Sequence, residues 1–157
     1  MKVDDLDIGI LRELREHANL SYKEIAEKLK AHPNTVMLRI KRLEREGVIR
    51  RYSADIDYSK LGLKLRAAIM MKTRGVNVLN VGKNGQVSGI LHIPQLIALY
   101  GTAGPSDAIA FVEVKDINEL TEVIAKIQNT PGVIRTSTYV ILATYKHSSE
   151  YNPFKKH

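Results

Sequence analysis

Residues 21–47 contain two helix-start signals and one helix-stop signal, and no other feature of the sequence constrains the fold as strongly. Ser21 and Glu24 have the spacing of a capping box, in which each side chain accepts a hydrogen bond from the backbone N–H of the other residue. Pro33 suits the first turn of a helix, where its missing N–H leaves no bond unmade. Gly47 suits the left-handed residue that follows a helix. The spacing predicts a short helix, a tight turn and a longer helix.

Apolar residues at helical spacing indicate which side of each predicted helix faces the core. A first helix before Ser21 completes a three-helix unit, and the third helix must face the other two. Residues 48–52 and 54–56 indicate a small hairpin, or wing, behind the third helix. The apolar residues assigned to buried faces are Leu6, Ile10, Leu11, Leu14, Ile25, Ala26, Leu29, Val36, Ile40 and Leu43.

Positive charge is concentrated on the third predicted helix and just after it. The chain of 157 residues has 24 Lys and Arg against 17 Asp and Glu, a net charge of +7. Residues 28–52 alone contain eight cations and two acids, whereas residues 1–60 together carry 13 cations and 11 acids. Such a polarised domain favours a nucleic-acid face. With the apolar side buried, the opposite arc is expected to hold Asn34, Thr35, Leu38, Arg39, Lys41, Arg42 and Arg45.

This arrangement predicts a helix-turn-helix that binds double-stranded DNA, with the first turn of the third helix in the major groove. Asn34 and Thr35 are short enough to reach base edges or phosphates, and Arg39 can form two hydrogen bonds to guanine or hold a phosphate. The residues expected on backbone phosphates are Lys41, Arg42, Arg50 and Arg51. The full set predicted to contact DNA is Ser21, His32, Asn34, Thr35, Leu38, Arg39, Lys41, Arg42, Arg50 and Arg51. The alternative is an ordinary three-helix bundle whose basic face is only solvated.

The second half of the chain alternates between strand-like and helix-like segments. Strands are predicted at residues 65–71, 96–100, 109–114 and 133–145, and helices at residues 78–92 and from 116 to 130. This order is the ferredoxin-like βαββαβ plan. The helix at 78–92 is a weak one, because Gly82, Gly85 and Gly89 each cost about 1 kcal/mol relative to alanine. The sequence therefore predicts an α+β protein with a winged helix-turn-helix domain at 1–52, a linker at 53–63 and a ferredoxin-like domain at 64–157.

Several classes of chemistry lack their sequence signals. The chain has no cysteine, which excludes a disulfide scaffold, a cysteine-ligated metal site and a thiol nucleophile. Its five histidines never stand three or four residues apart, as a helical metal pair requires. No apolar run approaches the ~20 residues of a membrane span. We expect no enzyme activity, no cofactor, no metal and no membrane partner, and a cytoplasmic, nucleoid-associated protein.

The motifs of both halves resemble those of the Lrp/AsnC family, the feast/famine transcription regulators of bacteria and archaea. In the first half the similar residues are Leu6-Asp7, Ile10-Leu11, Leu20-Ser21, Glu24-Ile-Ala26, Thr35-Val36, Arg39-Ile-Lys-Arg-Leu-Glu44 and Gly47-Val-Ile49. In the second half they are Gly104-Pro-Ser-Asp107, which matches the Gly-x-x-Asp loop of the family, Pro131-Gly-Val133 and Arg135-Thr-Ser-Thr138. The resemblance covers about residues 3–146, and the glycines of 78–92 and the tail from residue 150 depart from it.

The resemblance implies a sequence-specific transcription regulator of amino-acid metabolism. It implies that the second domain forms a homodimer, that dimers often assemble into octamers, and that a small effector, usually an amino acid, binds where dimers meet. Carried over by position, the effector-binding residues are Gly101, Thr102, Ala103, Gly104, Ser106, Asp107, Thr136 and Thr138. Backbone N–H groups of a glycine-rich loop suit a carboxylate, and Asp107 suits an ammonium group. The alternative is that Gly104 only makes the turn and Asp107 only caps it.

Two other functions remain open at this stage. An architectural DNA-binding protein of low specificity is consistent with the isoelectric point near 9.6. Some proteins that resemble this family are sirohaem decarboxylases, whose active site should gather His and Arg around a tetrapyrrole. Here His92 and His147 stand alone in the sequence.

Overall fold

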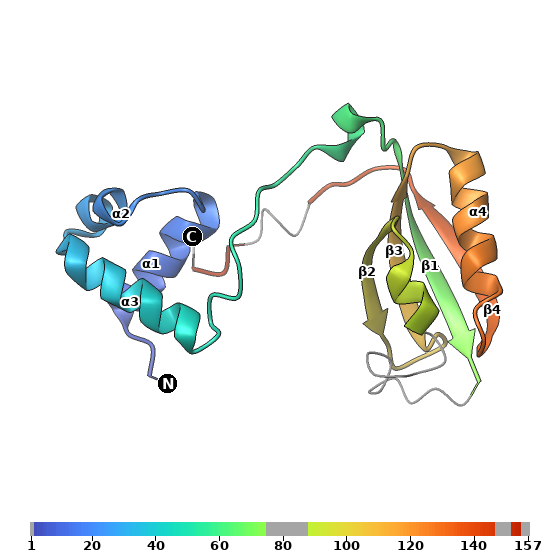
Figure 1. Ribbon diagram of the computed structural model, residues 1–157, viewed down its shortest axis with the longest axis horizontal. Coiled ribbons are helices and arrows are strands. Elements are labelled where there is room, and N and C mark those ends of the chain that lie inside the picture. The colour runs from blue at the N-terminus through green and yellow to red at the C-terminus, as the bar shows by residue number, and fades with distance from the viewer. Residues whose placement is uncertain (1, 75–87, 147–151, 155–157) are drawn as a thin grey trace. The chain divides into compact units, whose positions relative to one another are not determined.

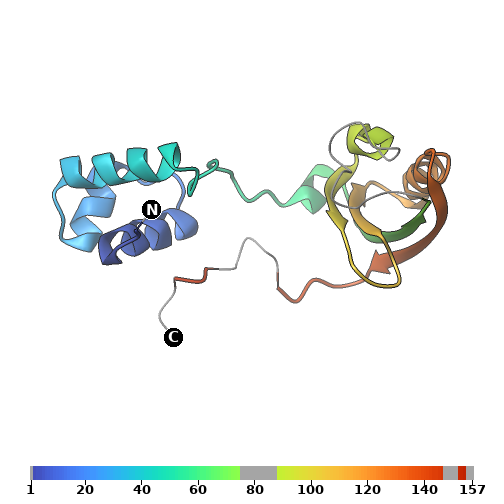
Figure 2. The same ribbon diagram turned by 90° about the horizontal axis from the view of Figure 1, so that it is seen from below.

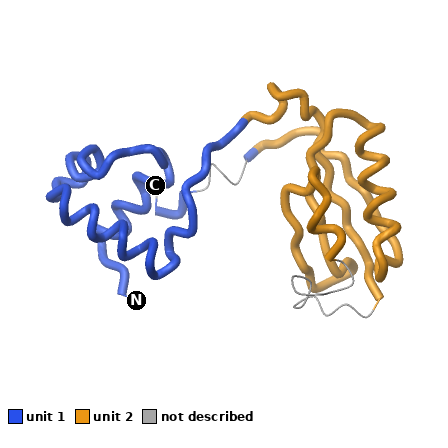
Figure 3. Tube along the Cα trace, viewed as in Figure 1, with its two compact units in different colours: residues 1–56, 146–157 blue, residues 57–145 orange. Residues whose placement is uncertain are grey.

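The computed structural model describes residues 2–74, 88–146 and 152–154, and the chain forms two compact units (Figure 1). The first, which we call the helical unit, contains residues 1–56 together with 146–157. The second, the sheet unit, contains residues 57–145 (Figure 3). The chain therefore passes from the helical unit into the sheet unit and then returns to the helical unit.

Three helices form the helical unit, namely α1 (Asp5–Glu16), α2 (Tyr22–Leu29) and α3 (Pro33–Arg45). Ser21 caps α2 through the predicted capping box with Glu24, and Pro33 occupies the first turn of α3. A second capping box, between Asp4 and Asp7, starts α1. The predicted apolar faces meet in a core whose buried members are Ile10, Ile25, Ala26, Val36, Ile40 and Leu43.

The segment after α3 differs from the hairpin expected at residues 48–56. Gly47 ends the helix with a left-handed φ of 73°, as predicted. Residues 50–57 then run as a single segment that pairs with no strand among the described residues. A side chain holds this segment in place of a backbone ladder, since the Tyr52 hydroxyl donates to Glu44 Oε1 at 2.7 Å. The hairpin prediction is therefore wrong, because the wing segment pairs with no second strand in the part of the chain that the structure describes.

The sheet unit is a four-stranded antiparallel sheet with the strand order β2-β3-β1-β4. Its elements are β1 (Leu65–Thr73), β2 (Leu96–Gly101), β3 (Ala108–Val114), β4 (Val133–Ile141), the helix α4 (Ile117–Gln128) and the 3-10 helices η1 (Tyr58–Leu61) and η3 (Ser88–His92). The helices α4 and η3 cover one face of the sheet (Figure 2). None of the helices in the described ranges has the length and hydropathy needed to cross a bilayer.

The sheet unit departs from the sequence prediction at two places. Of the helix predicted at 78–92, residues 78–87 lie outside the described residues, and residues 88–92 form the 3-10 helix η3 instead of an α-helix. The last strand ends at Ile141 instead of at residue 145. Its ladder with β1 ends there, since Arg66 opposite Ile141 is the last pair.

The two faces of the sheet differ because successive side chains of a strand point to opposite sides. One face packs under α4 and η3 and contributes Ala67, Ile69, Met71, Ala110 and Val112 to the core. The other face has no covering element among the described residues. It carries Met70 and Phe111, with Tyr100 and Tyr139 each 57% exposed. The Tyr100 and Phe111 rings meet edge to face, with centroids 6.0 Å apart.

Candidate functional site

The solvent side of α3 carries a continuous row of exposed side chains. Asn34, Leu38, Lys41 and Arg45 follow one another at intervals of three or four residues, which places them on one stripe of a helix, and all are exposed. Thr35 lies exposed beside them. Leu38 is 63% exposed, on a helix that buries three apolar residues on its other side. An apolar side chain among polar ones suits contact with the methyl group of thymine.

The guanidinium groups of Arg39 and Arg42 pair with acids at the start of α1, which the sequence pattern does not predict. Arg39 Nη1 pairs with Asp4 Oδ2 and, at 3.2 Å, with Asp7 Oδ1. Arg42 Nη2 pairs with Asp7 Oδ2. Position 39 flanks the buried stripe at 3.6 residues per turn, so its assignment to the outer arc was wrong. Position 42 lies between Thr35 and Leu38 around the helix, toward the outer arc, but its guanidinium turns back to Asp7. Their guanidinium groups tie α3 to the start of α1.

The charges of this cluster reinforce one another. The backbone N–H of Asp7 and the guanidinium of Arg39 lower the pKa of Asp4 to about 2. Hydrogen bonds to Asp4 and Asp7 in turn raise the pKa of Arg39. Asp7 is completely buried, so its carboxylate needs the two guanidinium groups and the backbone N–H of Asp4 that surround it. Asp4 and Arg39 are therefore charged near neutral pH, and the cluster locks α1 onto α3.

Ser21 and His32 stand at the N-termini of α2 and α3. The Ser21 hydroxyl donates to Glu24 Oε2 at 2.7 Å and accepts from the Glu24 backbone N–H at 3.3 Å. His32 Nδ1 accepts from the backbone N–H of Asn34 at 3.3 Å. Both side chains are exposed while they cap their helices. A helix N-terminus favours anions, which suits the two positions for phosphate.

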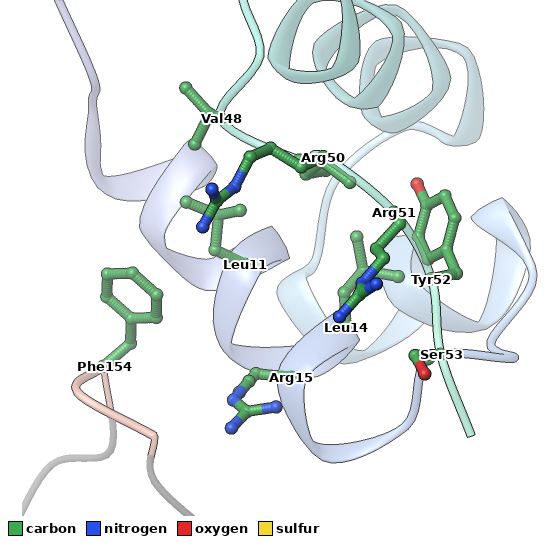
Figure 4. Close-up of a pocket in the computed structure, with 11 residues that line it drawn as sticks. Leu11, Leu14, Arg15, Val48, Arg50, Arg51, Tyr52, Ser53 and Phe154 are labelled. Atoms are coloured by element: carbon green, nitrogen blue, oxygen red, sulfur yellow. The ribbon is translucent and has the colours of Figure 1, made fainter. Parts of the chain in front are cut away.

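Arg50 and Arg51 line a cleft between α1 and residues 48–53, with Leu11 and Leu14 on the other side (Figure 4). Both arginines are exposed. The adjacent Tyr52 is fixed by its bond to Glu44, and partial burial together with that acid raises its pKa. Sequence analysis missed this bond. The signal for it in the sequence is that Glu44 is one of only two acids in the basic run of residues 28–52.

The loop between β2 and β3 contains most of the residues expected to bind an effector. It closes on itself, since the Thr102 backbone N–H donates to the Asp107 carbonyl at 2.9 Å and the Thr102 hydroxyl donates to the Ser106 carbonyl at 2.7 Å. Gly104 has a φ of 145°, a conformation that other residues rarely adopt. Gly101 and Ala103 are exposed beside it, and the loop is thus a preformed turn at the edge of the sheet.

The Asp107 carboxylate already has partners. Oδ1 accepts from Lys72 Nζ at 2.6 Å, and Oδ2 accepts from the Thr73 backbone N–H at 2.7 Å and from its hydroxyl at 3.2 Å. Lys72 is the main cause of a lowered pKa of Asp107. The residue therefore ties the loop to the end of β1, and any ammonium group that bound there would share it with Lys72.

Thr136 and Thr138 lie on β4 and do not join this loop within one chain. Thr136 pairs with Met71 of β1, which pairs on its other side with Ala108 at the end of the loop. The strand β1 therefore separates the two parts by two strand spacings, roughly 10 Å. The Thr136 hydroxyl accepts from Gln128 Nε2 of α4 at 2.9 Å, so it faces the helical side of the sheet. Across the described ranges, no three His, Asp or Glu side chains gather as a metal site.

Two family models match the chain. Residues 3–50 match winged helix-turn-helix DNA-binding domains, and residues 87–151 match the Lrp/AsnC ligand-binding domain. The chain is 31% identical to an uncharacterised HTH-type transcriptional regulator of Pyrococcus furiosus, over 98% of this chain and 100% of that one. It is 29% identical to the HTH-type transcriptional regulator FL11 of Pyrococcus horikoshii, over 94% of this chain and 95% of that one.

Solved structures give the same result. LrpC of Bacillus subtilis matches with a TM-score of 0.81 and 25% identity, over 93% of this chain and 99% of that one. A regulator of Neisseria meningitidis, solved as a complex with L-Met, matches with a TM-score of 0.84 and 24% identity, over 93% and 94%. The fold class and the regulator function predicted from the sequence are confirmed. The chain belongs to the Lrp/AsnC family of DNA-binding, effector-modulated transcription regulators.

Proposed function

We propose that a homodimer of this chain binds a pseudo-palindromic DNA site, with α3 of each subunit in the major groove. The observation that carries this proposal is the exposed stripe of α3, which combines hydrogen-bonding, apolar and cationic side chains on a helix whose other side is locked by Asp7. Two recognition helices related by a dyad read half-sites about 34 Å apart, or a multiple of that distance. Such a regulator acts on the nucleoid in the cytoplasm.

The proposed contacts fall into two groups. Asn34, Thr35 and Leu38 face base edges, because their side chains are short and lie on the first turns of α3. Phosphates are held by Ser21, His32, Lys41, Arg50 and Arg51. Arg39 and Arg42 are assigned a supporting role, since their guanidinium groups are engaged by Asp4 and Asp7.

A second subunit is proposed to cover the open face of the sheet. That face presents Met70, Phe111, Tyr100 and Tyr139, and an apolar sheet face of this kind is rarely left in water. Further assembly of dimers, up to octamers, is part of the same proposal. Tyr139→Glu should shift the dimer toward monomer in sedimentation velocity, whereas Glu122→Lys on the outer side of α4 should not.

The effector is proposed to be a free amino acid bound at the loop of residues 101–107. Exposed backbone of Gly101 to Gly104 suits its carboxylate, and Asp107 suits its ammonium group, which would share that side chain with Lys72. Because Thr136 and Thr138 lie two strands away within one chain, the site is completed at a contact between subunits. The Neisseria relative bound to L-Met supports this class of ligand. The matched families and the named relatives also favour a regulator over a sirohaem decarboxylase.

Two experiments test these proposals. Footprinting and competition at fixed salt should reveal a protected site with a dyad and a preference over random DNA. Equal binding to both would support an architectural protein instead, because nonspecific binding has a salt slope without a preferred site. A thermal-shift screen of the twenty amino acids should raise the melting temperature for at least one, since a ligand of the native state stabilises it. Asp107→Asn should remove that shift, and Glu122→Gln should keep it.

A further inference from the structure

The tail segment, residues 152–154, makes direct contacts with α1. Asn152 Nδ2 donates to the backbone carbonyl of Arg12 at 3.3 Å and to Glu16 Oε1 at 2.9 Å. Asn152 Oδ1 accepts from the backbone N–H of Phe154 at 3.1 Å. Three of the four hydrogen-bonding positions of this side-chain amide are therefore used. The Asn152 amide therefore binds the C-terminal half of α1 and also forms a turn within the tail segment.

The backbone turn of the tail segment directs the Phe154 side chain toward α1 (Figure 4). An asparagine side-chain oxygen that accepts a hydrogen bond from the backbone N–H two residues later forms a local turn. Pro153 lies between the two residues and restricts the backbone further. Phe154 is partly buried and lines the cleft between α1 and residues 48–53, whose volume is about 720 Å³. Figure 4 shows its ring directed toward the side of α1 that carries Leu11. Phe154 is one of only two phenylalanines in the chain.

We propose that this cleft is the docking surface for the tail segment of the same chain, which acts as a clasp on the helical unit. The connectivity of the chain determines what the clasp does. The chain leaves the helical unit after Ile56 and returns to it at Lys146, so a docked tail connects the two units by two covalent segments instead of one. The clasp also places Phe154 in the same cleft as Arg50 and Arg51. It therefore limits the freedom of the unit that carries α3, and it does not depend on which DNA that unit binds.

Cross-linking of engineered cysteines tests the clasp, and the natural chain contributes no competing thiol because it has no cysteine. Arg12→Cys with Pro153→Cys brackets the contact and keeps Asn152, because the bond to residue 12 is accepted by its backbone carbonyl. The matched control is Glu27→Cys with Pro153→Cys, since Glu27 lies exposed on α2 and makes no hydrogen bond to residues 152–154 of the described tail. With a short bismaleimide, the first pair should react roughly tenfold faster, because docking raises the effective concentration of the thiols. The product should have the mass of one chain.

Phe154→Ser in the first pair should slow the reaction to the control rate, whereas Leu142→Ser, at a side chain that is 94% exposed, should not. Equal rates for the two pairs would overturn the clasp. A product with the mass of two chains would overturn it as well, because the docked tail would then belong to a second copy. Circular dichroism confirms folding of each variant. Should the first pair not fold, Glu16→Cys with Pro153→Cys crosses the same contact, is compared with the same control and is judged by the same outcomes.

Discussion

Arg39 of α3 donates to Asp7 of α1, with 3.2 Å between Nη1 and Oδ1, and the carboxylate that receives it is completely buried. Arg42 reaches the other oxygen of the same carboxylate. The Asp4 backbone also donates to Asp7, so one side chain closes the capping box of α1 and anchors α3. The direction in which α3 presents its exposed stripe thus depends on one buried acid.

Asp7→Ala should lower the free energy of unfolding of the helical unit by about 3 kcal/mol, near the lower end for breaking a buried ion pair, because Arg39 keeps Asp4 as a partner. The measurement is urea denaturation at neutral pH. Asp5→Ala is the control. Asp5 is exposed in the same turn of α1, and its loss should cost less than about 0.5 kcal/mol. Similar losses for both variants would show that Asp7 holds nothing beyond the helix start.

Thr35→Ala should reduce the preference for the operator by about 1 kcal/mol, roughly fivefold, and leave the melting temperature unchanged. Its hydroxyl is exposed on the first turn of α3, where a base edge is expected. Arg39→Ala should show the reverse pattern, with a lower melting temperature and an equal loss of affinity for operator and random DNA. Competition binding and thermal unfolding on the same samples separate the two. Loss of discrimination in Arg39→Ala without loss of stability would restore a base contact to this arginine.

The helical unit was largely predictable because its signals are local. The Ser21–Glu24 capping box, Pro33 and Gly47 each act within a few residues, and all three features appear where the spacing places them. The partners of Arg39 were not predictable in this way. A cation at the margin of a buried stripe is ambiguous until the facing helix is known, and Asp7 is 32 residues away in the sequence.

The sheet unit shows the same division between local and distant information. Strand positions followed from alternation, and α4 from its cap and apolar face. The pairing of Lys72 with Asp107 links residues 35 positions apart, and the sequence pattern of the loop gives no indication of it. Whether Thr136 and Thr138 join the proposed effector site depends on how subunits meet, which is information that one chain does not contain.

Asp4→Asn should remove part of the acid sensitivity of the helical unit. In the folded chain, the Asp7 backbone and Arg39 lower the pKa of Asp4 from 3.8 to about 2. Because the folded pKa lies below the unfolded one, this carboxylate stabilises the fold above about pH 4, and that contribution disappears as the pH falls toward 2. Asparagine still caps the helix but does not titrate. Urea denaturation between pH 5 and about 2 should give a shallower loss of stability for the variant, and an identical slope would contradict the assignment.

Arg51→Ala should weaken binding to operator and random DNA by the same factor and lower the salt dependence of the affinity by about 0.9 in the log–log slope, the effect of one phosphate contact. The position of Arg51 is the reason for this expectation. Arg51 is exposed on the segment held near α3 by the bond between Tyr52 and Glu44, so we expect its charge to meet a phosphate and not a base. Lys115→Ala is the control, because it removes an exposed cation of the sheet unit. Tyr52→Phe should reproduce part of the Arg51→Ala effect, since it keeps every cation but frees the segment, and an unchanged salt slope in both variants would remove the wing from the DNA interface.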